Sequence, residues 1–96
     1  MVCFDYSSEA GHTLDYLSHS PQSHDYRALN QALERLAIEH LTRWARRKVF
    51  NLEDGTPGFL IEVFAGSKTW WILWRYSSRS DLAVIAIEYI GPSPVR

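Results

Sequence analysis

Four side chains of this sequence could together handle a phosphate group. The guanidinium of Arg75 can hold two phosphate oxygens at once, and the ammonium group of Lys68 would add positive charge beside it. Tyr89 or His40 could move protons, as general acid–base chemistry requires. These four residues are therefore the candidates for cleavage of a phosphodiester bond.

Two of these residues also have a purely structural interpretation. An arginine in an apolar strand often pairs with a carboxylate, and Glu62 and Glu88 lie on the strands predicted to flank Arg75. His40 lies on the apolar side of a predicted helix, where a hydrogen-bonded boundary histidine is more common than a catalytic one. The ion pair and the phosphate site are thus alternatives for Arg75.

The sequence predicts no metal and no cofactor. His12, His19 and His24 do not follow a known metal-ligand spacing. Cys3 is the only cysteine, which excludes an internal disulfide and a cysteine-rich metal site.

A second group of residues could bind a partner. Four cations end the second predicted helix: Arg43, Arg46, Arg47 and Lys48. They complement the helix dipole, or they form a patch for phosphate or an acidic partner. Ile38 lies opposite Leu29 on that helix, and Trp71 points away from Trp70 on its strand, so both are candidates for a partner surface.

The residues of the candidate sites are positioned by a predicted hairpin over 68–90. Two runs of aromatic and β-branched residues flank a short polar loop. On the first strand, Arg75 shares a face with Trp71 and Leu73, and the other face carries Trp70, Ile72, Trp74 and Tyr76. On the second strand, strict alternation sets Leu82, Val84, Ala86 and Ile90 against Ala83, Ile85, Ile87 and Tyr89. Both strands are apolar on both faces, so the sheet needs cover on each side. The chain's own helices can supply one side, and a partner the other.

The remaining elements precede this hairpin. Val2, Phe4 and Tyr6 predict a strand, Ser7 or Ser8 caps a helix that ends at Pro21, and a second helix runs from Ser23 or His24 to Lys48. A turn-rich connector over 51–58 leads to a strand over Phe59–Phe64. The expected fold is α+β, with the order β-α-α-β-β-β, in which two N-terminal helices pack on one face of a mostly antiparallel four-stranded sheet.

Chain length, net charge and the lengths of the apolar runs limit the kind of protein this can be. A length of 96 residues suits one domain over 1–96. A net charge of -1 argues against nucleic-acid binding driven by bulk charge and leaves binding through a local patch open. No apolar run reaches the roughly 18 residues of a membrane span, and the first residues lack the pattern of a signal peptide. We expect no membrane association and a cytoplasmic location.

The sequence resembles the RelE/ParE superfamily, the toxins of type II toxin–antitoxin pairs. The segments that carry this resemblance are Phe4–Ala10 with Leu14 and Leu17, Leu52 with Phe59–Val63, Trp70–Tyr76, and Val84–Gly91. The resemblance implies a cognate antitoxin that folds over the toxin, and growth inhibition through mRNA cleavage on the ribosome or through DNA gyrase. It is compatible with a homodimer and with a toxin–antitoxin hetero-oligomer.

Three positions depart from the pattern of the ribonuclease members. Basic residues of that group are matched here by Glu53, Trp71 and Pro92. Cleavage of RNA needs cations around the phosphorane, and none of these three side chains supplies one. The resemblance therefore leaves three functions open: an mRNA endoribonuclease, a non-nuclease gyrase inhibitor, and an interaction module that has lost the basic residues.

Overall fold

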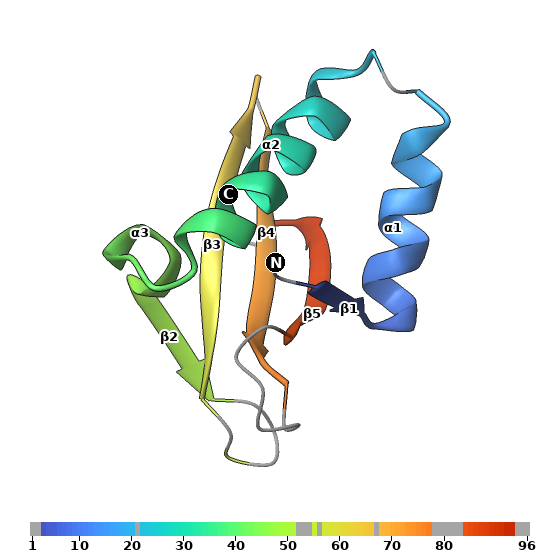
Figure 1. The fold of residues 1–96 in the computed structure, drawn as a ribbon. Helices are drawn as coiled ribbons and strands as arrows, with labels where there is room; N and C mark the ends of the chain where they lie inside the picture. Colours follow the sequence, from blue (N-terminus) through green and yellow to red (C-terminus); the bar gives the residue numbers. More distant parts are fainter. Residues whose placement is uncertain are drawn as a thin grey trace.

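A computed structural model describes residues 3–20, 22–51, 55, 57–66, 68–77 and 84–93 of the chain. It contains three helices and five strands (Figure 1). In chain order they are β1 (Cys3–Tyr6), α1 (Ser8–Ser18), α2 (His24–Glu39), α3 (Arg43–Arg46), β2 (Lys48–Asn51), β3 (Pro57–Ala65), β4 (Lys68–Tyr76) and β5 (Val84–Pro92). Val2, Pro21, Leu52, Glu53, Leu82 and Ala83 lie outside the described residues.

The strands form one mixed sheet in the order β1-β5-β4-β3-β2. β1 pairs parallel with β5, whereas the β5–β4, β4–β3 and β3–β2 pairs are antiparallel. The α+β class is confirmed, and the prediction of a four-stranded sheet is wrong. The fifth strand is β2, which begins at Lys48. The ring of Phe50 in β2 lies so close to Gly58 of β3 that a Cβ there would be 2.6 Å from it.

Serine side chains begin both long helices, as the sequence predicts. The Oγ of Ser7 accepts a hydrogen bond from the N–H of Ala10, and the Oγ of Ser23 accepts one from the N–H of Tyr26. Each bond satisfies a backbone donor that the first helical turn leaves without a partner.

The second helix ends at Glu39, so the prediction of a continuous helix to Lys48 is wrong. Thr42 is extended, with ψ 164°, and begins the single turn of α3. Both its hydroxyl and its backbone N–H donate to the carbonyl oxygen of Glu39. This local bonding offers the backbone an alternative to the helical ladder, and it frees Lys48 and Val49 to enter the sheet.

The hydrophobic core lies between the three helices and one face of the sheet. Its largest fully buried side chains are Leu29, Leu36, Ile72, Trp74, Ile85, Ile87 and Ile90. The indole N–H of Trp74 donates to the carbonyl oxygen of Ala45 over 3.1 Å, which ties α3 to the same face. All three helices therefore cover one side of the sheet (Figure 1). No helix within the described residues is long and apolar enough to cross a membrane.

A β-bulge in β5 changes which side chains face the helices. Leu73 pairs with Tyr89 and Trp74 pairs with Ile87, so Glu88 is an extra residue in the ladder. Because a bulge places two residues opposite one, Ile90 returns to the face of Ile87. The prediction that Ile90 and Ile87 lie on opposite faces is wrong for this reason.

Candidate functional site

The sheet face opposite the helices carries a broad set of partly exposed side chains. The alternation of β3, β4 and β5 places there Leu60, Glu62, Phe64, Trp71, Leu73, Arg75, Glu88 and Tyr89. Phe64 is 74% exposed, and no helix of the described residues packs against this face. Partly exposed apolar side chains grouped on one face of a sheet are typical of an interaction site. We call these eight residues the open face.

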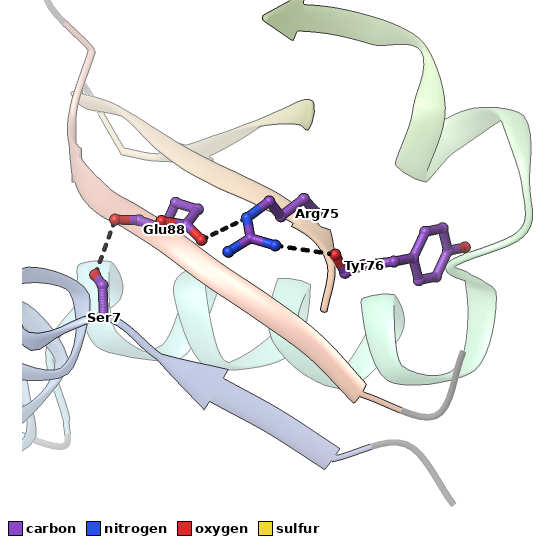
Figure 2. Close-up of polar contacts among 4 residues, drawn as sticks. All are labelled: Ser7, Arg75, Tyr76 and Glu88. Atoms are coloured by element: carbon purple, nitrogen blue, oxygen red, sulfur yellow. Dashed lines mark hydrogen bonds and ion pairs between the residues drawn. The ribbon is translucent and has the colours of Figure 1, made fainter. Parts of the chain in front are cut away.

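Arg75 and Glu88 form an ion pair within the open face (Figure 2). The Nε of Arg75 is 2.8 Å from the Oε1 of Glu88, and an Nη1–H of Arg75 donates to the carbonyl oxygen of Tyr76 over 3.2 Å. Both side chains are less than one-third exposed. The guanidinium thus already has a carboxylate partner, which is the structural alternative that the sequence offered for Arg75.

The bulge that presents Glu88 is anchored by Ser7. The Oγ of Ser7 donates to the carbonyl oxygen of Glu88 over 2.8 Å, and the backbone N–H of Ser7 donates to the carbonyl oxygen of Ile87. Figure 2 shows the resulting chain of contacts from Ser7 through Glu88 to Arg75. A residue that begins α1 therefore helps to fix a carboxylate on the open face.

Tyr89 does not lie beside the guanidinium of Arg75. Its ring covers Gly91, where a Cβ would come within 2.2 Å of the phenolic oxygen, and its hydroxyl points toward the carbonyl of Pro92. Pro92 pairs with Trp70, five residues from Arg75 along β4, which corresponds to roughly 16 Å. Tyr89 itself pairs with Leu73, two residues from Arg75, but its hydroxyl is directed toward the end of the sheet opposite Arg75.

Lys68 lies still farther from Arg75 along the same strand. Lys68 pairs with Ala65 at the first residue of β4, and Arg75 is the next-to-last residue. The two are separated by seven residues, or roughly 23 Å. The structure therefore does not bring Lys68, Tyr89 and Arg75 together as one catalytic group.

His40 belongs to a different cluster, on the helix side of the sheet. Its Nδ1 is 3.0 Å from the hydroxyl of Tyr76, and its carbonyl oxygen accepts from the Nε of Arg46 over 3.1 Å. An Nη2–H of Arg46 also donates to the Tyr76 hydroxyl, and the guanidinium carbon is 5.2 Å from the centre of that ring. These contacts hold the break between α2 and α3 against β4.

Tyr76 is the member of this cluster that the sequence-based prediction of the site missed. It continues the inward-facing series of Trp70, Ile72 and Trp74 on β4, so its hydroxyl points into the helix layer. A phenol that is partly buried in this way needs a polar partner. That requirement was the signal available in the sequence.

The four predicted basic residues do not form one patch. Arg46 is bound to Tyr76, and Lys48 pairs with Glu62. Arg43 and Arg47 are exposed, and neither has an ion-pair partner among the described residues.

The two hydrophobic candidates for partner binding lie on different layers of the molecule. Ile38 is 84% exposed on α2, away from the open face. Trp71 is half-buried on the open face, and its Nε1 is buried without a hydrogen-bond acceptor in the part of the chain that the structure describes. A donor left in this state costs free energy.

The described residues hold no group of three side chains of the kind that bind metals. Pro92, one of the three positions that depart from the ribonuclease pattern, ends β5 opposite Trp70.

Comparisons with protein-family models, with curated proteins and with solved structures gave no match. The function is therefore argued from the geometry of the open face and its surroundings.

Proposed function

We propose that the chain is a toxin-like protein of the RelE/ParE type that inhibits growth by binding a protein target rather than by cutting RNA. A cognate antitoxin would neutralise it by covering the open face. The observation that carries this proposal is a sheet whose described helices all lie on one face. The other face holds Leu60, Phe64, Trp71 and Leu73 beside the ion-paired Arg75.

The composition of the open face supports protein binding. Aromatic and arginine side chains are enriched in the parts of interfaces that contribute most of the affinity. The ion pair of Arg75 and Glu88 leaves the centre of this face without a net charge. A partner can therefore cover it with apolar side chains, without leaving an unpaired charge buried.

The same geometry argues against RNA cleavage. A ribonuclease needs a base, an acid and cations that converge on one phosphate. Arg75 has a carboxylate partner, Lys68 lies at the far end of β4, the hydroxyl of Tyr89 points toward Pro92, and His40 is on the other side of the sheet. Inhibition of a target such as DNA gyrase by binding requires no such convergence of side chains in the toxin. Cleavage of an mRNA on the ribosome would require it.

The proposal implies a cytoplasmic setting, with the antitoxin as the first partner. A toxin–antitoxin hetero-oligomer and a homodimer would both cover the apolar side chains of the open face. An interaction module without toxicity is the alternative, because the same face would serve it equally well.

The test is inducible expression of the chain in bacteria, combined with two readouts of the target. We expect growth arrest, induction of the SOS response and no new mRNA ends in primer extension. New mRNA ends at arrest would refute the binding mechanism. Normal growth with folded, soluble protein would refute the toxin assignment and favour the interaction module.

A matched pair of variants connects this activity to the open face. Leu73→Lys places a charge in the middle of the open face, and Ile38→Lys places the same charge on the exposed side of α2. We expect Leu73→Lys to abolish growth arrest and Ile38→Lys to retain it, with circular dichroism showing that both are folded. Equal activity of the two variants would contradict a role for the open face.

A further inference from the structure

The outer edge of β3 is only half occupied by β2. The paired residues run from Lys48 with Leu60 to Asn51 with Pro57, so the ladder ends at Leu60. From Ile61 to Ala65, β3 has no neighbour on that side among the described residues. The N–H and C=O groups of such an edge are available to another strand.

Three adjoining hollows follow this free edge. They have volumes of about 340, 270 and 260 Å³. The first lies at Leu60 beside Trp44, the second at Val63 beside Ala32, and the third at Gly66 beside His24. Phe64 lines all three, and each also shares further residues with its neighbour, so we describe them together as one groove between β3 and the helices. We call it the β3 groove.

The walls of the β3 groove combine apolar and polar side chains and lie close to the free backbone. Trp44 stands between the first two hollows, with the guanidinium carbon of Arg35 4.0 Å from the centre of its ring. Ala28 and Ala32 of α2 form the inner wall, and their small side chains leave room beside β3. Phe64, largely exposed, forms the outer rim.

The charges along the groove are predominantly positive. Its lining contains the cations Arg27, Arg35, Arg47 and Lys48, and its carboxylate is that of Glu62. Lys48 neutralises Glu62, and Arg35 is paired with Glu39. Arg27, at the Gly66 end, and Arg47, at the Leu60 end, have no carboxylate partner among the described residues.

We propose that the free edge of β3 accepts an extended segment of a partner protein that alternates apolar and acidic residues. The segment would extend the sheet beyond the end of β2, by main-chain hydrogen bonds to Ile61–Ala65, in the manner of strand addition. Its apolar side chains would pack on Trp44 and Phe64. Its acidic residues would meet Arg47 at one end of the groove and Arg27 at the other.

The charge distribution favours this occupant over a second copy of the chain. Two copies paired antiparallel through β3 would bring Arg27 of each toward Arg47 of the other. Like charges brought together oppose association. An acidic segment from another protein removes this repulsion and provides partners for both arginines.

This inference is independent of the proposed function. The β3 groove is at the edge of the sheet and shares Leu60, Glu62 and Phe64 with the open face, whereas Leu73 and the ion pair of Arg75 and Glu88 do not line the groove. Strand addition at β3 would hold for a toxin and for a non-toxic interaction module alike, so failure of one proposal does not imply failure of the other.

The test uses the full chain and a fluorescein-labelled peptide of alternating glutamate and valine, about seven residues long. Fluorescence anisotropy should show saturable binding that weakens as salt is added, since exposed charges are screened. A peptide with lysine in place of glutamate should not bind. A peptide with proline at alternate positions should not bind either, because proline cannot donate to a ladder.

A matched pair of charge reversals locates the contact. Arg47→Glu changes a cation of the groove, whereas Arg43→Glu makes the same change on α3 at an exposed residue that does not line it. We expect Arg47→Glu to weaken binding about tenfold, as loss of an exposed attraction plus a new repulsion implies. Arg43→Glu should stay within about twofold of the parent chain.

Amide hydrogen exchange identifies the edge itself. Peptide binding should slow exchange at alternate residues within Ile61–Ala65, because alternate backbone groups of an edge strand point outward. Absence of saturable binding, protection confined to β4 and β5, or peptide-independent dimerisation through β3 would each overturn the proposal.

Discussion

The hydroxyl of Ser7 bonds to the carbonyl oxygen of Glu88 over 2.8 Å and also accepts the backbone N–H of Ala10 over 3.1 Å. One side chain therefore begins α1 and fixes the bulge of β5, although the two residues are 81 positions apart. The bulge in turn directs the carboxylate of Glu88 to Arg75. The first turn of the first helix and the open face of the sheet are coupled through this hydroxyl.

Ser7→Ala should destabilise the protein more than the loss of a helix cap alone. It removes a cap worth about 1 kcal/mol and a second hydrogen bond worth about 1 kcal/mol. Ser23→Ala is the matched control, because among the described residues its side chain bonds to the N–H of Tyr26 alone. Urea unfolding should give a free-energy loss of about 2 kcal/mol for Ser7→Ala and about 1 kcal/mol for Ser23→Ala. Equal losses would show that the bond to Glu88 contributes nothing.

Glu88→Gln should cost more stability than Glu39→Gln. The Arg75 pair is less than one-third exposed, so removing the carboxylate charge leaves a guanidinium partly shielded from water, at a cost of about 1–2 kcal/mol. The pair of Arg35 and Glu39 is an exposed i,i+4 pair on α2, which contributes about 0.3–0.5 kcal/mol. Unfolding of both variants at neutral pH measures the difference. A smaller loss for Glu88→Gln would show that the pair on the open face is not shielded.

The parts of this fold that follow from local pattern could be predicted from the sequence. Ser7 and Ser23 predict where their helices begin, because a capping hydroxyl accepts a hydrogen bond from a backbone N–H only three residues later. The central hairpin follows from two apolar runs around a polar loop. The inward series of Trp70, Ile72, Trp74 and Tyr76 follows from the period of a strand, and three of these side chains are buried.

The parts of the fold that depend on residues far apart in the chain could not be predicted from the sequence. Nothing near Glu88 in the sequence marks a bulge, because the bulge is fixed by Ser7 at the other end of the chain. The apolar and basic run after Glu39 continues a helical pattern, and Thr42 breaks it by bonding to one carbonyl. The convergence of His40, Arg46 and Tyr76 needed both that break and the position of β4.

Trp74→Phe should be more destabilising than Trp70→Phe. Trp74 is fully buried and its N–H satisfies the carbonyl of Ala45, so the shorter ring leaves both a cavity and an unpaired acceptor. Together these effects cost about 2–4 kcal/mol. Trp70 donates instead to the carboxylate of Asp25, which is only half-buried and can turn to water. Thermal and urea unfolding of the two variants should rank them in this order, and the reverse order would contradict the assignment of Trp74 to the centre of the core.

Tyr6 should make the protein less stable at alkaline pH. Burial raises the pKa of the Tyr6 phenol above its usual value of 10.0, and the charge of Tyr26 adds to the rise. Because the folded state holds this proton more tightly than the unfolded state, the contribution to stability is complete below pH 10 and is lost as the pH rises through the folded pKa.

Tyr6→Phe removes the titrating group, and the ring still contacts the ring of Phe4, whose centre is 5.9 Å away. Unfolding midpoints between pH 9 and 11 should therefore fall less steeply for Tyr6→Phe than for the parent chain. Tyr16→Phe is the control for loss of a phenolic hydroxyl that is not buried, because the side chain of Tyr16 is 72% exposed. Parallel curves for the parent and Tyr6→Phe would show that the junction of β1 and α1 leaves this hydroxyl in water.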